Sequence, residues 1–317
     1  MGNISINEIL NDKTHGLKLR IISGGKGLER KVATTDVNRP QLALAGYWNY
    51  FAYKRIQVFG KTEMSYLRGL SVEERSKIFS KMFSYKIPCL IIARGQKPFP
   101  ELIELAKKSG TVLLRSPLIT TRLISKLHHY LEDRFAPTTT MHAGLVDVYG
   151  VGTLLLGESG IGKSECALEL LERGHRVVAD DIVDIKKTSD NKLIGTSSEL
   201  IKHHMEVRGL GVISIEDLFG VSSICDSKEI DLVINLEEWN SSKEYDRLGL
   251  KDSEFEILDV KIPQVSIPVR PGRNIAVITE IAAMNHRLKK MGYHSAKELN
   301  RRLLKWMKVG GNEKEKG

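Results

Sequence analysis

Cysteine is scarce in this chain, whose 317 residues contain only Cys89, Cys166 and Cys225. An odd number of widely spaced cysteines fits neither a disulfide framework nor a zinc site, and it favours a reducing compartment. Long hydrophobic runs are missing as well, since no stretch approaches the ~20 apolar residues of a membrane-spanning helix. We therefore expect a cytoplasmic protein without a membrane partner.

Acidic residues are few in the first half of the chain. Residues 1–135 contain 23 Lys and Arg but only 11 Asp and Glu, whereas the rest contains 25 and 28, and the net charge is +9. A basic surface can bind nucleic acid. However, the basic residues are scattered along the sequence, and helix-turn-helix, zinc-finger and RNA-binding signatures are missing. We therefore expect a solvated basic surface and no nucleic-acid partner.

The length predicts two domains, each large enough for its own core. In the first half, alternating patterns indicate strands at residues 88–93 and 111–114 and helices at 100–108 and 118–131. Pro137 and the polar run at 138–140 interrupt this pattern, which places an α/β domain of unclear role at residues 1–134 and a second domain at 135–317. In the second domain we expect strands at 151–156, 176–179, 232–236 and 274–278, and helices at 165–173, 281–291 and 295–309.

A phosphate-binding loop motif, G-x-x-x-x-G-K-[ST], spans residues 157–164. It follows an apolar run and precedes a helix-forming run that stops at Gly174. In such a loop backbone N–H groups surround a phosphate, Lys163 reaches the β- and γ-phosphates, and Ser164 presents its hydroxyl to Mg²⁺. The residues expected to bind ATP are Gly157, Glu158, Ser159, Gly160, Ile161, Gly162, Lys163 and Ser164.

Two adjacent carboxylates, Asp180 and Asp181, follow the apolar strand expected at residues 176–179. A carboxylate in this position can hold Mg²⁺ or accept a proton from an attacking hydroxyl. Neighbouring residues of a strand point to opposite faces, so we expect the two aspartates to differ in role. An aspartate-rich turn without catalytic function is the alternative.

Three further segments contain groups that suit phosphate chemistry. The first combines a hard-cation ligand, Glu206, and a guanidinium fork, Arg208, in the run Met205, Glu206, Val207, Arg208, Gly209, Leu210 and Gly211. The second contains Arg247, which could neutralise a phosphoryl group during transfer. The third is a loop in which two prolines stiffen the backbone around two arginines, Pro268, Val269, Arg270, Pro271, Gly272 and Arg273.

Together with His142 and the run at residues 173–181, these motifs resemble the bacterial HPr kinase/phosphorylase family. The similarity covers residues 135–310 in the family's order and spacing, and it extends more loosely to residues 38–40 and 44–47. The segments at 205–211 and 268–273 are the specific part of the match, because many unrelated proteins share the phosphate loop.

The resemblance implies a homohexameric enzyme whose second domain has a phosphate-loop kinase fold similar to that of phosphoenolpyruvate carboxykinase. It implies a bifunctional serine kinase and phosphorylase of the phosphocarrier protein HPr, which regulates carbon metabolism. The kinase would use Mg²⁺ with ATP, or pyrophosphate as alternative donor, and the phosphorylase would transfer the phosphate to inorganic phosphate and release pyrophosphate. By the same resemblance His142, Lys163, Asp181 and Arg247 form the catalytic set, and residues 268–273 matter more for dephosphorylation.

The residue assignments leave alternatives open. Ser164 and Glu206 are the expected Mg²⁺ ligands, and Asp181 is the expected general base, with Asp180 as the second choice. A phosphate-loop kinase of a small molecule also fits the motifs, as does a nucleotide sensor whose basic first domain engages nucleic acid. The carboxylates and Arg247 favour an enzyme, because a sensor has no need of a base.

Overall fold

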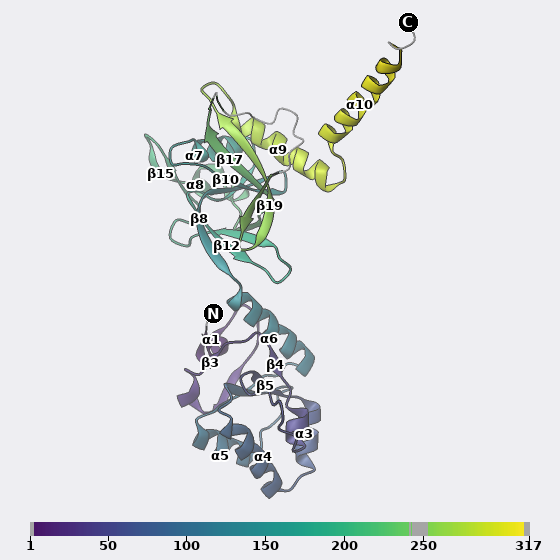
Figure 1. The fold of residues 1–317 in the computed structure, drawn as a ribbon. Helices are drawn as coiled ribbons and strands as arrows, with labels where there is room; N and C mark the ends of the chain where they lie inside the picture. Colours follow the sequence, from purple (N-terminus) through teal and green to yellow (C-terminus); the bar gives the residue numbers. More distant parts are fainter. Residues whose placement is uncertain (1–2, 241, 243–252, 314–317) are drawn as a thin grey trace. The chain divides into compact units, whose positions relative to one another are not determined.

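The structure is a computed structural model that describes residues 3–240, 242 and 253–313, and it divides into two units, Met1–Ala136 and Pro137–Gly317 (Figure 1). Within the described residues, no helix combines the length and the apolar character that crossing a membrane requires.

A five-stranded sheet forms the centre of the first unit, in the order β2-β7-β6-β5-β4. Four of its strands are parallel, and β2 runs antiparallel to β7. Its strands are β2 (Arg20–Ser23), β4 (Val37–Asn38), β5 (Ile56–Phe59), β6 (Cys89–Ile92) and β7 (Val112–Arg115). A separate two-stranded sheet consists of β1 (Ile4–Ser5) and β3 (Lys31–Val32).

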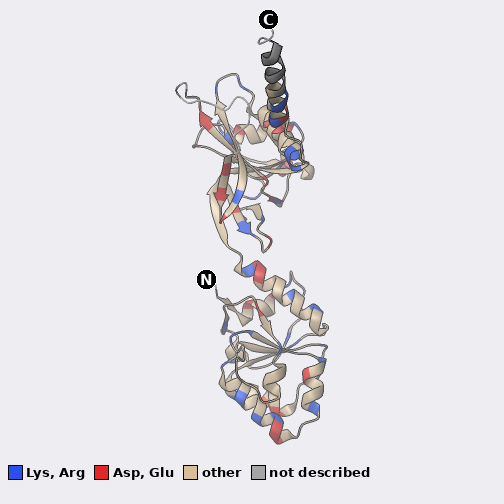
Figure 2. Ribbon diagram, turned by 45° about the vertical axis from the view of Figure 1, so that its right-hand side comes forward, with Lys and Arg blue, Asp and Glu red and all other residues tan. Residues whose placement is uncertain are grey.

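Helices cover both faces of this sheet, because successive side chains of its buried strands point to opposite sides. On β6, Ile91 packs with Ile9 of helix α1 (Ile6–Asn11) and with helix α6 (Thr120–Phe135). Leu90 and Ile92 pack on the other face with Phe79. That face carries α3 (Lys61–Arg68), α4 (Val72–Ser84) and α5 (Pro100–Ser109) (Figure 1). The short helix α2 (Gln41–Leu44) adds Leu44 to the same cluster, and η1 (Gly25–Gly27) is a short 3₁₀ turn. Lys and Arg are spread over the helices and strands of this unit (Figure 2).

The second unit contains a six-stranded mixed sheet in the order β11-β9-β10-β17-β19-β18. Strands β10, β17 and β19 pair in parallel, and β11 runs in the same direction because β11 and β10 are both antiparallel to β9, so the carboxyl ends of these four strands share one edge. The strands are β9 (Gly144–Val148), β10 (Val151–Leu156), β11 (Arg176–Ala179), β17 (Leu232–Glu238), β18 (Ser253–Ile257) and β19 (Val260–Val269).

Two smaller sheets complete the second unit. An antiparallel sheet in the order β16-β13-β12-β8 comprises β8 (Thr138–His142), β12 (Ile182–Lys187), β13 (Leu193–Ser197) and β16 (Ser227–Glu229). A hairpin comprises β14 (His204–Val207) and β15 (Gly211–Ser214). The helices are α7 (Lys163–Glu172), α8 (Ile215–Phe219), α9 (Ile275–Lys290) and α10 (Ser295–Glu313), with a 3₁₀ turn η2 (Val221–Ser223).

Strand β10 separates two cores. Leu155 faces α7 and α9, where it clusters with Leu170 and Ala276. Leu154 faces the four-stranded sheet, where it clusters with Val183. The strand that enters the phosphate loop is therefore buried on both sides, which gives the loop a rigid base.

Two elements differ from the sequence-based expectation. The strand predicted at residues 274–278 is wrong: helix α9 begins at Ile275, and the side chain of Asn274 caps it by accepting a hydrogen bond from the Val277 N–H at 2.7 Å. The threonines at 138–140 were expected to interrupt the regular secondary structure. They belong instead to strand β8, since they pair with β12 and alternate in exposure.

Strand β19 contains two prolines, each where the strand has one described neighbour. Pro263 pairs with Glu254 of β18 and lies before the register with β17 begins. Pro268 pairs with Glu237 of β17 and lies beyond the last residue paired with β18. Proline lacks an N–H, so it fits where one side of a strand needs no ladder hydrogen bond.

Candidate functional site

The phosphate loop connects the end of β10 to the first residue of α7. Its glycines at 157, 160 and 162 have φ values of 147°, 83° and 107°, a region that favours glycine. A Cβ on Gly157 would lie 2.6 Å from the carbonyl oxygen of Leu236 on β17, so a side chain there would collide with the neighbouring strand. The loop conformation is therefore set by glycine and by the parallel pairing of β10 with β17.

Backbone carbonyl groups of the phosphate loop hold the Lys163 side chain over the loop. Its ammonium group donates hydrogen bonds to the carbonyl oxygens of Gly157 at 2.8 Å and Glu158 at 2.9 Å. An ammonium group has three donors, so one more hydrogen bond to an anion remains possible. The position at the amino-terminal end of α7 adds the positive potential of the helix.

The segment predicted at residues 205–211 forms the β14–β15 hairpin, and it contacts the phosphate loop. Met205 is buried in the core cluster that includes Leu170 of α7, which anchors the hairpin. At its turn, the Arg208 guanidinium is so close to Gly160 that a Cβ there would lie 2.9 Å from its nearest nitrogen. Glu206 is exposed on the same hairpin. The structure thus adds a second cation beside Lys163 at the loop.

Asp180 is a buried carboxylate at the start of the turn after β11. The residue is 4% exposed, and burial raises its pKa to about 6; the neighbouring carboxylates of Asp181 and Glu165 raise it too, whereas the Ser164 hydroxyl and Lys163 lower it. Within the described part of the chain, no donor forms a well-aligned hydrogen bond with either Oδ atom. Asp180 is therefore an uncompensated carboxylate next to the start of α7.

Asp181 lies beside His142 at the surface. Strand β11 ends at Ala179, and Asp181 has a φ of 70°, so the two aspartates occupy a tight turn. The expectation that they lie on opposite faces of a strand is therefore wrong. The Asp181 carbonyl accepts a hydrogen bond from the Ala143 N–H at 3.0 Å, and His142 pairs with Ile182. Both Asp181 and His142 are exposed, whereas Asp180 is buried. The two candidate bases thus have different access to a substrate.

The arginine-containing segment at residues 268–273 begins at the same edge of the sheet. Pro268 and Val269 are the last residues of β19, so only the remainder is a loop. Arg270 lies over the Trp239 ring with its Cζ 3.2 Å from the ring centroid, and Arg273 donates to the Pro268 carbonyl oxygen at 3.1 Å. The loop leads directly into α9, whose Ile275 would contact a Cβ on Gly162 at 3.9 Å.

Arg247, with the rest of residues 243–252, lies outside the described residues. In the described residues, no three His, Cys, Asp or Glu side chains gather as a ready metal site. A divalent cation at the loop would therefore need hydroxyl, carboxylate and phosphate oxygens together, a set that suits Mg²⁺. The Ser164 hydroxyl next to the uncompensated Asp180 offers part of this set.

Two contacts at the site were not anticipated from the sequence. Trp239, which directly follows β17, stacks against the Arg270 guanidinium. The position of Trp239 after a buried parallel strand could have marked it as a site residue in the sequence. Glu280 of α9 accepts hydrogen bonds from Arg173 at 2.6 Å and from Tyr149 at 3.3 Å, and it pairs with His175 Nε2 at 2.9 Å. No sequence pattern marked this network, which ties α9 to the end of α7.

Comparisons with known proteins cover both units. Residues 4–131 match the family model described as HPr Serine kinase N terminus, and residues 133–303 match HPr Serine kinase C-terminal domain. The HPr kinase/phosphorylase of Caldanaerobacter subterraneus is 49% identical over 305 residues, covering 96% of this chain and 99% of that protein. The HPr kinase/phosphorylase of Geobacter sulfurreducens is 49% identical over 315 residues, covering 99% of each chain. A solved HPr(Ser) kinase/phosphatase from Coxiella burnetii is 34% identical and covers 51% of this chain and 98% of its own, with a TM-score of 0.47.

Proposed function

Because the chain belongs to the HPr serine kinase family, with curated relatives of matching length that are HPr kinase/phosphorylases, we propose that it phosphorylates a serine of HPr and reverses that reaction. The observation that carries this proposal is the arrangement of Lys163, Arg208 and Asp180 around one glycine-lined loop. Two cations suit a phosphoryl group, and a carboxylate beside them suits a metal or a proton.

In the kinase direction, residues 157–164 hold the donor phosphates of ATP or pyrophosphate. Lys163 and Arg208 compensate the charge that develops on the transferred group. Ser164 and Glu206 would hold Mg²⁺, which would supply positive charge to the donor phosphates. Asp180, which lies beside Ser164, is a further ligand candidate.

Asp181 takes the proton from the attacking serine hydroxyl. Its exposure beside His142 supports this role, because a serine on a protein substrate can reach it, whereas Asp180 is 4% exposed. Asp180 remains the alternative base. In reverse, an oxygen of inorganic phosphate attacks the phosphorus of the phosphoserine, and the bond between that phosphorus and the serine oxygen breaks. The protonated Asp181 returns its proton to the departing serine oxygen, and pyrophosphate is the product.

Residues 268–273 serve the dephosphorylation direction more than the kinase direction. There two anionic groups, phosphate and phosphoserine, must approach each other, so additional cations are needed. Arg273 is exposed and anchored by Pro268, which keeps a guanidinium at the edge of the site. By family analogy, Arg247 adds a further positive charge.

One incubation tests the proposal. Purified chain, HPr, Mg²⁺ and ATP labelled at the γ-phosphate should yield HPr labelled on serine, and added inorganic phosphate should then release labelled pyrophosphate. Lys163→Ala is the control that should do neither. An ATP sensor without chemistry would bind ATP and leave HPr unlabelled, and a small-molecule kinase would also leave it unlabelled; either outcome would refute the proposal.

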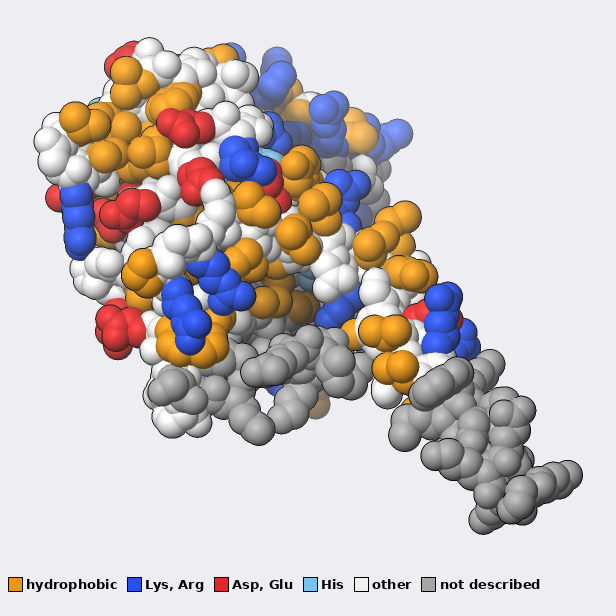
Figure 3. All heavy atoms as spheres, turned by 90° about the horizontal axis from the view of Figure 1, so that it is seen from above, with side chains coloured by type: hydrophobic (Ala, Val, Ile, Leu, Met, Phe, Trp, Pro, Cys, Tyr) orange, Lys and Arg blue, Asp and Glu red, His pale blue; other side chains and the backbone are white. Residues whose placement is uncertain are grey.

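We also propose that the chain acts as a cytoplasmic homohexamer. Exposed apolar side chains in the second unit support assembly: Leu210, Val212, Leu218 and Val221 are 64–78% exposed. Hydrophobic side chains cluster at several places on the surface in Figure 3. Light scattering coupled to size exclusion should give six times the mass of one chain, and a monomer at micromolar concentration would contradict the hexamer.

A further inference from the structure

The loop between β19 and α9 is short and is anchored at both ends. At one end, Val269 is the last residue of β19 and pairs with β17. At the other end, Asn274 is the N-cap of α9. Between them the Arg273 N–H donates to the Arg270 carbonyl oxygen at 3.2 Å, which closes a turn. Because so few residues separate the two anchors, the position of Asn274 helps to set where the Arg273 guanidinium lies.

Asn274 makes two side-chain hydrogen bonds, and they reach two different helices. Its Oδ1 accepts from the Val277 N–H of its own helix at 2.7 Å. Its Nδ2 donates to Oε1 of Glu169 on α7, the helix that begins at Lys163 of the phosphate loop. A cap needs only the oxygen, which serine or aspartate would also supply. The amide N–H is therefore required only for the contact with α7.

The same two helices also pack through their buried sides. Leu170 of α7 and Ala276 of α9 belong to one apolar cluster. Cys166 and Thr279 are 3% and 0% exposed, and their Sγ and Oγ1 atoms lie 3.8 Å apart. Apolar contacts are non-directional, whereas a hydrogen bond has a preferred distance and angle. The bond from Asn274 thus fixes the first residue of α9 at one point on α7.

We propose that Asn274 is a positioning residue for dephosphorylation: by binding Glu169 it holds the start of α9, and with it Arg273, in place beside the phosphate loop. This role rests on the proposed function, in which Arg273 offsets the repulsion between inorganic phosphate and phosphoserine. Without the contact the guanidinium is less well aligned with the two anions, and charge-assisted hydrogen bonds weaken when they are misaligned. The kinase direction needs this cation less and therefore depends less on Asn274.

An exchange of donor and acceptor in the full chain tests the contact. Asn274→Asp keeps the cap oxygen but places a second carboxylate against Glu169. We expect phosphorolysis of phosphoserine-HPr to fall about tenfold or more, and phosphorylation of HPr to fall by less than about threefold. Adding Glu169→Gln to this variant gives α7 an amide that can donate to the introduced carboxylate. The double variant should recover phosphorolysis to within about threefold of the wild-type rate.

A matched control separates the contact from a change of charge. Asn274→Asp combined with Glu172→Gln has the same net charge as the rescued variant and as the wild type. Glu172 is an exposed residue of the same helix, but the hydrogen bond of Asn274 runs to Glu169. The control should therefore phosphorolyse as slowly as Asn274→Asp alone.

A neutral variant covers the case in which Asn274→Asp fails to fold. Asn274→Ser keeps a good cap but is too short to reach α7, so it should also slow phosphorolysis about tenfold. Both directions are measured on each preparation. A variant that is merely less stable loses both rates in proportion, whereas a displaced Arg273 lowers the ratio of phosphorolysis to phosphorylation.

The possible outcomes separate this role from the proposed function. If the wild type runs both directions, but the Asn274 variants lower both rates equally or the Glu172 control recovers as well as the Glu169 exchange, the positioning role is overturned and the proposed function stands. A wild-type chain that neither labels HPr nor releases pyrophosphate from phosphoserine-HPr would overturn both.

Discussion

Replacing Asp180 by asparagine should stabilise the protein at neutral pH. Burial raises the pKa of Asp180 from 3.8 to about 6, so the folded state binds the proton more tightly than the unfolded state. Between these two values the folded state holds more protons, and stability falls as the pH rises. Above about pH 6 the carboxylate is ionised in both states, and its full destabilising effect is present.

The magnitude follows from the same two values. One pKa unit corresponds to about 1.4 kcal/mol, so the difference between 3.8 and about 6 corresponds to about 3 kcal/mol at pH 7. Asparagine keeps the shape of the protonated side chain without its charge. For a unit of this size, 1 kcal/mol shifts the unfolding temperature by about 2–4 °C, so Asp180→Asn should raise it by about 6–12 °C at pH 7.

Scanning calorimetry at pH 4, 5.5 and 7 measures this effect. The gain of Asp180→Asn over the wild type should be near zero at pH 4 and largest at pH 7. Asp181→Asn is the control, because an exposed residue should change stability by no more than about 0.5 kcal/mol. A gain that does not vary with pH, or a loss of stability at pH 7, would refute the assignment of Asp180 as an uncompensated buried charge.

Four other substitutions test the site. Lys163→Ala should lower both phosphorylation of HPr and dephosphorylation of phosphoserine by at least about a hundredfold, since both directions share the loop; initial rates with γ-labelled ATP and with labelled phospho-HPr measure this. Asp181→Asn should abolish kinase activity and retain ATP affinity within about threefold, as measured by titration calorimetry; a retained rate would assign the base to Asp180. Arg273→Ala should slow dephosphorylation about ten- to hundredfold more than phosphorylation, measured on one preparation over a phosphate titration, and equal losses would reject a directional role. Glu280→Gln should destabilise the second unit by about 1–3 kcal/mol at pH 7, because the Arg173 hydrogen bond holds the Glu280 pKa at about 2. The difference in unfolding free energy between the wild type and this variant should be full above about pH 4.5 and should decline as the pH falls toward 2. Denaturant unfolding at pH 3 and pH 7 measures it, and an equal difference at both pH values would contradict this reasoning.

The elements around the phosphate loop could be predicted because their signals are local. An apolar run, a glycine-rich turn and a helix-forming segment follow one another, and the structure has β10, the loop and α7 in that order. The resemblance to the HPr kinase family is confirmed by both family models and by near-full-length relatives. The similarity to phosphoenolpyruvate carboxykinase stays a prediction.

Other elements depended on information that a local pattern lacks. A short apolar run such as residues 275–278 suits a strand or a helix, and the Asn274 cap decided for the helix. Strand β8 exists because its threonines pair with β12, a segment more distant along the chain. The two aspartates were expected on a strand, but Ala179 ends β11 and places them in a turn.

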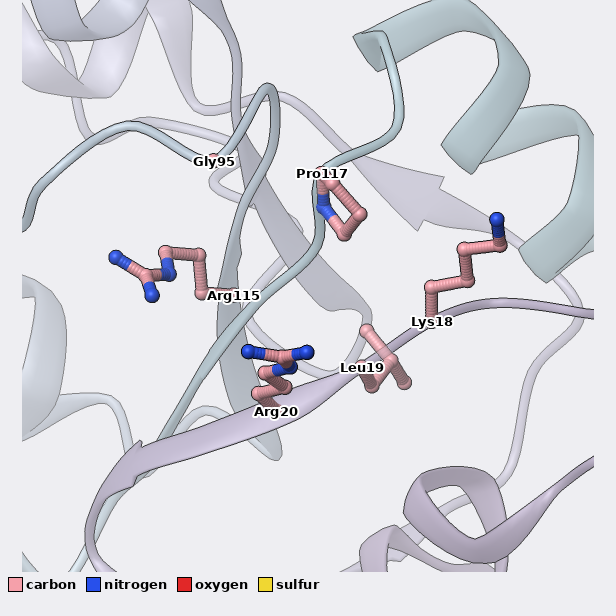
Figure 4. A pocket seen from close by; sticks show the side chains of 6 residues that line it. All are labelled: Lys18, Leu19, Arg20, Gly95, Arg115 and Pro117. Atoms are coloured by element: carbon pink, nitrogen blue, oxygen red, sulfur yellow. The ribbon is translucent and has the colours of Figure 1, made fainter.

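The contacts within the site required the register of the sheets. Arg208 lies beside Gly160, and Trp239 beside Arg270, because hairpins and parallel strands bring distant segments together. The same reason explains a pair of basic residues in the first unit. Arg20 and Arg115 are far apart along the sequence, and only the pairing of β2 with β7 places them opposite each other (Figure 4).

The prolines of β19 limit how copies of this chain can join. An exposed strand edge invites another strand to add to the sheet, and proline is one of the residues that block such addition. Pro268 lies on the part of β19 that extends past its described partner β18. A foreign strand docking there would meet a position without a hydrogen-bond donor. Addition of a strand from another copy at this position is therefore disfavoured.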